Sequence, residues 1–265
     1  MFRYKIIQFC GGLGNQMFQY AYFQHKKYSS KLSNYGFDYS IIKDSKEHNG
    51  YELYSVFGIR QSYLNVFVLW LSRLPKIRKI FVLRIKNVDS YQEETLESYK
   101  KIECPITSNK IILFYFGYWQ SLLYLTSAPV EFKKIFKFRT ELLNDKSSLC
   151  VKDIAAFESV SVHIRRGDYV SESWCEDENG EVCPIEYYNR AIRRLIDLKG
   201  DKLIFFIFTN DYEWVNRNLS LNSSFLVDWN IGTDSWQDMY LMSKCKHNIM
   251  ANSSFSWWGA WLNTN

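Results

Sequence analysis

The chain has 265 residues, of which 47% are hydrophobic and 23% are charged, a composition typical of an ordinary globular protein. This length is enough for two compact domains or one large one. Even the longest uninterrupted apolar runs, such as residues 66–71, are far too short for a helix that crosses a bilayer.

Charge is distributed unevenly along the chain. Residues 1–150 hold 22 Lys and Arg against 12 Asp and Glu, a net charge of +10, whereas residues 151–265 hold 11 against 16, a net charge of −5. We therefore predict two domains, 1–150 and 151–265, with different partners. A basic first domain can meet an anionic membrane or a polyanionic substrate. Because no arginine-rich arm or zinc-finger spacing occurs, nucleic acid is not expected as a partner.

The first domain begins with an apolar strand over residues 4–9. The glycine-rich sequence CGGLGN follows, and apolar spacing then predicts a helix that reaches residue 28. A glycine turn between a strand and a helix offers backbone amides and a positive helix end to an anion. The alternative is a tight turn that only lets the helix pack on the sheet, since the G-x-G-x-x-G spacing of dinucleotide sites is absent.

The rest of the first domain is less regular. Residues 29–63 are polar and rich in tyrosine, and we predict loops and short elements there. Residues 64–86 mix aliphatic and basic residues around Pro75, which indicates an amphipathic helix pair. This pair either contacts a membrane surface or lies in the core with snorkelling lysines. A buried strand at 111–119 and a basic helix at 130–139 complete this domain.

The second domain alternates strands and helices, which indicates a parallel sheet with helical crossovers, a Rossmann-like unit. The expected strands are 159–165, 203–208, 225–228 and 247–250, and the expected helices are 185–198, 212–218, 235–244 and 255–262. None of the six cysteines forms a C-x-x-C pair, so a structural zinc site is not indicated.

Polar residues follow three of these strands, at the carboxyl ends where ligands collect in open α/β sheets. His163, Arg165 and Arg166 belong to the sequence SVSVHIRRGDY, and arginine offers a fixed fork of donors that matches phosphate oxygens. The alternative is a strand that ends in a surface salt bridge. Thr209, Asn210 and Asp211 follow the second strand.

The last strand runs into Ser253 and Ser254, and small hydroxyl residues at a helix start either cap the helix or hold phosphate. Asp238 either pairs with two adjacent N–H donors of a purine such as guanine or is a solvated helix carboxylate. Together these strand ends predict a nucleotide or nucleotide-sugar site in the second domain. No D-x-D pair follows a strand, so Arg165 rather than a metal ion is expected to neutralise a diphosphate.

Longer motifs carry a resemblance to a known family. They are GGLGNQMFQYA at 11–21, HIRRGDY at 163–169, CPIEYYNRAI at 183–192, FTND at 208–211 and DSWQDMYLMSKCKHNIMANSSFSWWGAWLN at 234–263. With these motifs the chain resembles the bacterial α-1,2-fucosyltransferases of glycosyltransferase family 11, part of a wider group that includes α-1,6- and protein O-fucosyltransferases. The motifs lie in both domains, and residues 30–110 carry none of them.

The resemblance implies an α/β fold of the GT-B type, with two Rossmann-like domains facing across a cleft. It also implies an inverting enzyme that needs no metal or other cofactor and binds GDP-fucose with its second domain. Members of the family usually continue past a sequence like GAWLN into a further strand and helix. Because this chain stops at Asn265, its C-terminal end is expected to be short, as in a fragment or a short variant.

The resemblance also assigns roles to individual residues. Those expected to bind the donor are His163, Arg166, Asp238, Ser253, Ser254, Phe255, Gly14 and Asn15. Asp238 falls where relatives hold guanine, and His163 falls near the guanosine. Ser253 and Ser254 fall where relatives hold phosphate. Gly14 and Asn15 match a first-domain loop that closes on the fucose and the acceptor. Arg166 either joins the site or braces its loop.

In the predicted reaction, the 2-hydroxyl of a terminal galactose attacks C1 of fucose. Arg165 is expected to contact the β-phosphate and to stabilise the charge on the departing GDP. Asp168 and Asp211 are the main candidates for the general base, and Glu172 is a third. Asp168 can instead lock the two arginines by an ion pair, and Asp211 can instead orient the donor hydroxyls.

Acceptor and location are less constrained by the sequence. Lactose, N-acetyllactosamine and a lipid-linked O-antigen or capsule intermediate are all open as acceptors. The chain begins MFRYKIIQF and enters a strand without a signal peptide, so we expect a cytoplasmic location, peripheral at the inner face of the membrane. Two alternatives stay open: a transferase of another nucleotide sugar, and a non-catalytic or truncated GDP-sugar-binding protein.

Overall fold

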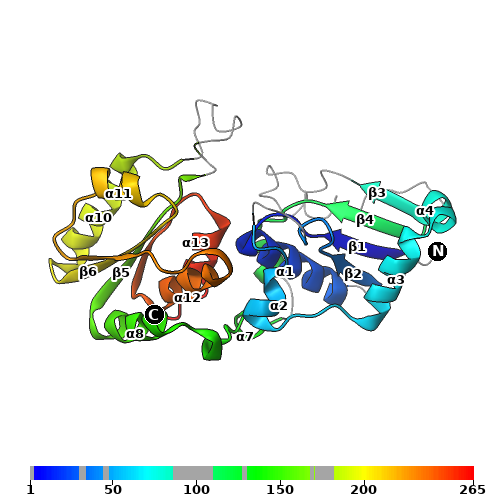
Figure 1. Cartoon of the computed structure of the whole chain (residues 1–265), viewed down its shortest axis with the longest axis horizontal. Helices are drawn as coiled ribbons and strands as arrows, with labels where there is room; N and C mark the ends of the chain where they lie inside the picture. Colours follow the sequence, from blue (N-terminus) through cyan, green and yellow to red (C-terminus); the bar gives the residue numbers. More distant parts are fainter. Residues whose placement is uncertain are drawn as a thin grey trace. The chain divides into compact units, whose positions relative to one another are not determined.

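The computed structural model describes residues 3–29, 34–43, 48–85, 110–126, 130–167, 170 and 182–265. The chain divides into two compact units, Met1–Lys137 and Phe138–Asn265, and each is built on its own four-stranded sheet (Figure 1). All strand pairs in both sheets are parallel. The predicted α/β class with two Rossmann-like units is therefore confirmed.

The first unit has the strand order β2-β1-β4-β3. Its strands are β1 (Tyr4–Gln8), β2 (Tyr35–Asp38), β3 (Val82–Ile85) and β4 (Ile112–Phe116). Its helices are α1 (Leu13–Ser29), α2 (Glu52–Phe57), α3 (Tyr63–Arg73), α4 (Pro75–Phe81), α6 (Leu123–Thr126) and α7 (Phe132–Ile135). β1 is central and buried on both faces, as expected for a parallel strand between two layers of helices.

The predicted helix pair around Pro75 is present as α3 and α4. Pro75 is the first residue of α4, a position where the missing N–H costs nothing, and the preceding Leu74 is extended and ends α3. The end of the predicted pair forms β3 instead of helix, because this segment pairs with β4. Within the described part of the chain, no helix is both long and apolar enough to cross a lipid bilayer.

The second unit has the strand order β7-β6-β5-β8. Its strands are β5 (Glu158–Ile164), β6 (Leu203–Thr209), β7 (Ser224–Val227) and β8 (His247–Ile249). Its helices are α8 (Asp145–Ala156), α10 (Ile185–Lys199), α11 (Tyr212–Asn218), α12 (Trp236–Lys244) and α13 (Ser254–Trp261), with 3-10 turns η1 (Thr140–Leu142) and η3 (Gly232–Asp234). The predicted alternation of strands and helices is confirmed for these elements.

β5 is covered on both faces although its sequence alternates apolar and polar residues. Val160, Val162 and Ile164 pack against buried side chains of α10 and α11. On the other face Ser161 Oγ accepts a hydrogen bond of 2.7 Å from Asn248 Nδ2. Burial of the polar face is tolerated because its groups find partners inside the protein.

The division between the units lies before α8, earlier than the boundary at residue 150 predicted from charge. Asn144 caps α8 by accepting from the Ser147 N–H, and its own side-chain amide donates to Asn230 Oδ1 at 2.9 Å. The Asn144 N–H donates to Gln237 Oε1 at 3.0 Å. α8 is thus bonded to the segment around α12, and the change in charge falls inside this helix rather than at the boundary.

Candidate functional site

The order of strands in the second unit reverses beside β5. β6 lies on one side of β5 and β8 lies on the other. In open α/β sheets ligands bind at the carboxyl ends of the strands at such a point. Arg165 follows β5 directly, and Ser253 follows β8 at the start of α13. The sheet therefore brings two of the predicted motifs to one edge.

The helices add further residues to this edge. Each crossover helix of a parallel sheet begins where the preceding strand ends, so the first turns of α11, α12 and α13 all lie at the carboxyl edge. Asp211 is the N-cap of α11, Asp238 lies in the first turn of α12, and Ser254 is the first residue of α13. All three were predicted site residues.

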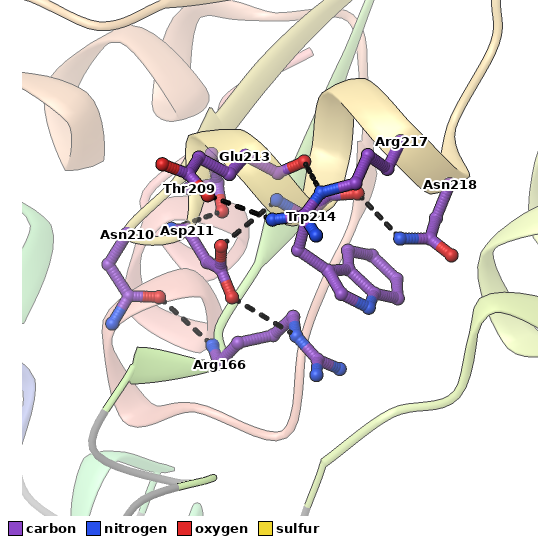
Figure 2. A network of polar contacts seen from close by, with 8 residues as sticks. All are labelled: Arg166, Thr209, Asn210, Asp211, Glu213, Trp214, Arg217 and Asn218. Carbon is purple, nitrogen blue, oxygen red and sulfur yellow. Dashed lines mark hydrogen bonds and ion pairs between the residues drawn. The ribbon is translucent and has the colours of Figure 1, made fainter.

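Arg166 is held by the loop that follows β6 (Figure 2). Its backbone N–H donates to Asn210 Oδ1 at 2.9 Å, and its Nε lies 3.4 Å from Asp211 Oδ2. Its guanidinium lies over the ring of Trp214, 4.2 Å from the centroid, which is the geometry of a cation–π contact. Of the two roles left open for Arg166, this geometry favours bracing the loop.

Gly167 completes the brace. Its φ of +21° lies at the edge of the region that favours glycine, and a Cβ at this position would lie 2.2 Å from Asn210 Nδ2. A side chain would therefore push Asn210 off the Arg166 N–H. The glycine of the RRG sequence allows the ends of β5 and β6 to approach each other.

Both carboxylate oxygens of Asp211 have partners in the protein (Figure 2). Oδ1 accepts from the Trp214 N–H at 3.0 Å and caps α11, while Oδ2 faces the guanidinium of Arg166. A general base needs an oxygen within reach of the acceptor hydroxyl. This arrangement favours a positioning role for Asp211. Asp168 and Glu172, the other candidates for the base, lie outside the described residues.

His163 is buried near the end of β5, and its ring lies 5.8 Å from that of Phe255 on α13. Burial, with a smaller contribution from the charge of Arg165, lowers the pKa of His163 to about 3, so the ring is neutral. Its Nδ1 is buried and has no hydrogen-bond partner among the residues that the structure describes. Because an unpaired buried nitrogen is costly, this atom is suited to a ligand group that reaches the switch point.

Asp238 occupies a polar cluster rather than the solvated position that was the alternative to base recognition. Its Oδ1 accepts from Asn230 Nδ2 at 2.8 Å, and the Oδ1 of Asn230 in turn accepts from Ser147 Oγ at 3.0 Å. Protein surrounds the carboxyl on most sides although part of its area stays exposed, and this burial raises its pKa to about 8. Its carboxyl is therefore largely protonated at neutral pH.

Ser253 caps the start of α13. Ser253 Oγ accepts from the Phe255 N–H at 3.3 Å, and the Ser253 N–H donates to Ala251 O at 2.8 Å. Ser254 is half-buried beside it. Capping uses one lone pair of the Ser253 hydroxyl oxygen, so its O–H can still donate to a phosphate oxygen. The cap therefore does not exclude phosphate binding.

The strand order of the first unit also reverses, beside β1. The GGLGN loop follows β1, and Gln120 follows the neighbouring β4. Gln120 Nε2 donates to Asn15 Oδ1 at 2.8 Å, while Gly14 is buried in the first turn of α1. Gly11 has a φ of +73°, and a Cβ there would lie 2.3 Å from Asn15 Nδ2. The loop and Asn15 are thus closely packed.

Two buried glutamines of α1 fix this loop, and sequence reasoning missed them. Gln16 Nε2 donates to Gly11 O and Gly50 O, and its Oε1 accepts from the Glu52 N–H. Gln19 Oε1 accepts from the Cys10 N–H at 3.1 Å, and its Nε2 donates to Gly117 O at 3.0 Å. The available signal was two glutamines three residues apart on the face of α1 that packs on the sheet.

We expect Gln19→Leu to lower the free energy of unfolding by about 2 kcal/mol or more, because it leaves the Cys10 N–H and the Gly117 carbonyl without partners. For a chain of this length this corresponds to a fall in Tm of roughly 4–8 °C. Gln24→Leu is the matched control, since the side chain of buried Gln24 bonds only the Tyr20 hydroxyl within the described part of the chain. Thermal unfolding followed by circular dichroism compares the two, and equal falls in Tm would contradict the assignment.

Among solved structures the chain is similar to the crystal structure of the α-1,6-fucosyltransferase NodZ soaked with GDP-fucose. The TM-score is 0.58 at 15% sequence identity, and the similarity covers 99% of this chain and 93% of that one. At this identity the similarity shows the fold, which is of the GT-B type.

The family model described as Glycosyl transferase family 11 matches residues 5–265. An α-1,2-colitosyltransferase of Escherichia coli is 35% identical over 97% of this chain and 87% of its own length. The O-antigen biosynthesis glycosyltransferase WbnK of the same species is 29% identical over 96% and 88%. The human galactoside α-(1,2)-fucosyltransferase 1 is 28% identical over 39% of this chain and 28% of its own length. The chain therefore belongs to glycosyl transferase family 11.

Proposed function

We propose that the chain transfers L-fucose from GDP-β-L-fucose to the 2-hydroxyl of a terminal galactose, with inversion at C1. The observation that carries the donor assignment is the position of Asp238. A carboxyl in the first turn of α12, held by Asn230, shares the carboxyl edge of the sheet with Arg165. A carboxylate there suits the two adjacent N–H groups of guanine, while the arginine suits the diphosphate.

Arg165 supplies the main charge stabilisation in this proposal. Negative charge grows on the β-phosphate as the bond to fucose breaks, and a guanidinium placed in advance stabilises that charge without reorganisation. The start of α13 adds a positive helix end. We propose that no metal ion is required, and transfer should therefore proceed at an unchanged rate in the presence of EDTA.

The acceptor hydroxyl must lose a proton as it attacks C1 of fucose. Because both oxygens of Asp211 have partners, we propose Asp168 as the base. Comparison of Asp168→Asn with Asp211→Asn tests this choice. Asp168→Asn should lose transfer and keep GDP binding, whereas Asp211→Asn should lower Tm because it weakens the brace on Arg166. The reverse outcome would make Asp211 the base.

A second candidate is transfer of colitose to the same hydroxyl, which the similarity to the α-1,2-colitosyltransferase favours. Colitose is fucose without its 3-hydroxyl, so both donors present the same GDP group and differ at one position of the sugar. We place fucose first because the galactoside α-(1,2)-fucosyltransferase resembles part of this chain. The similarity to WbnK, a glycosyltransferase of O-antigen biosynthesis, supports an O-antigen acceptor, which can be carried on a lipid at the inner face of the membrane.

The test is incubation of the chain with GDP-fucose, GDP-colitose and GDP-mannose in parallel, each with a panel of free and lipid-linked galactosides. We expect a fucosylated product, and linkage analysis by NMR should find an α-1,2 bond to galactose. Faster transfer from GDP-colitose would establish the second candidate. Binding of GDP without turnover of any donor would instead support a binding protein.

A further inference from the structure

α3 turns a side of mixed polarity toward the protein and a second, apolar side toward solvent. Its buried residues are Asn65, Leu69 and Ser72. Asn65 Nδ2 donates to Phe37 O on β2 at 2.6 Å, and Ser72 Oγ donates to Leu69 O at 2.7 Å. A surface helix of a globular protein normally buries its apolar stripe. α3 follows this rule only in part, because Leu69 lies in the core and Val68 packs against it while a second apolar side stays exposed.

The outward side of α3 carries an aromatic stripe. Tyr63, Val66, Phe67 and Trp70 follow helical spacing, and they are 96%, 51%, 54% and 57% exposed. The rings of Phe67 and Trp70 stack with their centroids 6.1 Å apart. A contiguous patch of large apolar side chains on a surface marks an interaction site. Because four such residues stand in one stripe, something is expected to cover them.

Cations flank the stripe. Residues 63–85 contain no Asp or Glu. They contain five exposed basic residues, which are Arg73, Lys76, Arg78, Lys79 and Arg84. Exposed Leu74 and Ile80 extend the apolar surface beside them. Aromatic rings together with lysine and arginine, and without acids, are typical of helices that lie in the interface of an anionic membrane.

We propose that the α3–α4 face, formed by the outward side chains of residues 63–80, docks on the surface of an anionic lipid bilayer. The rings enter the boundary between headgroups and acyl chains, and the cations contact anionic headgroups. A second copy of the chain fits this face less well, because a two-fold contact would bring the same basic residues against one another without any acid between them. The proposal is independent of which sugar the enzyme transfers.

The experiment is flotation of the full chain with vesicles of phosphatidylcholine, with and without phosphatidylglycerol. We expect binding that needs phosphatidylglycerol and weakens as salt is added. Lys76→Gln with Lys79→Gln should lower the partition coefficient roughly 30-fold, since each basic residue near such a surface contributes about fivefold. Lys133→Gln with Lys137→Gln, also exposed on the first unit, is the matched control and should bind as the unchanged chain does.

The aromatic part of the face needs its own variants. Phe67→Ser with Trp70→Ser should lower the partition coefficient roughly tenfold or more. Leu149→Ser with Leu198→Ser removes equally exposed apolar side chains from the second unit and should have no effect. Thermal unfolding followed by circular dichroism in the same preparations shows whether each variant is folded.

Two outcomes would overturn the proposal. One is vesicle binding that is absent, or that is unchanged in both the lysine and the aromatic variants. The other is a dimer in lipid-free solution that the aromatic variant converts to a monomer while its vesicle binding is unchanged. The second outcome would assign the face to another copy of this chain.

Discussion

Replacing Arg165 with alanine should lower kcat for sugar transfer by about 10²–10³-fold while Tm stays close to that of the unchanged chain. Arg165 stands at the carboxyl end of β5, at the point where the strand order of the second sheet reverses. The loss is expected mainly in kcat, because the interaction strengthens as charge develops on the departing GDP. Steady-state kinetics with GDP-fucose and a galactoside acceptor, together with thermal unfolding, measure both quantities.

Two other arginines serve as controls for this prediction. Arg166→Ala should lower Tm, because it removes the cation–π contact with Trp214 and the ion pair with Asp211. Arg193→Ala, on the exposed side of α10, should change neither kcat nor Tm. If Arg165→Ala keeps normal turnover and Arg166→Ala loses it, the roles assigned to the adjacent arginines are exchanged.

The second unit after α8 could be predicted closely because its strands and α-helices carry local signals, whereas α8 itself was not predicted. Helix-spaced apolar residues and short buried strands alternate there, and every predicted element appears in the structure. β2 in the first unit has no such signal. Its four residues, Tyr35–Asp38, are buried on both faces, so no alternation appears, and the strand exists because it pairs with β1.

The roles of single site residues depended on contacts that sequence does not contain. Nothing near Asp211 in the sequence shows that Arg166 will occupy one of its oxygens, since the two residues meet only across β5 and β6. Asp238 looks like an ordinary helix carboxylate until the fold places Asn230 against it. Gln16 and Gln19 look like surface residues until three loops are seen to converge on their amides.

GDP should bind the chain more tightly as pH rises toward 8, because recognition of guanine needs the ionised form of Asp238. Burial raises the pKa of this carboxyl to about 8, so only about one molecule in ten carries the charge at pH 7. The dissociation constant should therefore be about tenfold higher at pH 7, and about a hundredfold higher at pH 6, than at its lowest value above pH 8. Isothermal titration calorimetry across this range measures the dependence.

Asp238→Asn should remove this pH dependence and weaken GDP binding at pH 8 by about a hundredfold. It should also abolish the preference for GDP over inosine diphosphate, which lacks the 2-amino group that the carboxylate would bind. The exposed Asp234, changed to Asn, loses the same charge nearby and should bind GDP normally. A wild-type affinity that does not change between pH 6 and pH 8 would contradict the role of Asp238.

The same carboxyl should make the ligand-free fold less stable as pH rises. The folded chain holds the proton of Asp238 with a pKa of about 8, whereas the ordinary value is 3.8, so the folded state binds more protons than the unfolded state between these values. This stabilising contribution is complete below pH 4 and is lost as pH approaches 8. Asp238→Asn should accordingly raise Tm at pH 9 but not at pH 4, while Asp234→Asn changes Tm at neither. If burial of this carboxyl lowers the stability of the ligand-free fold and its ionised form binds guanine, part of the stability of the fold is given up for donor recognition.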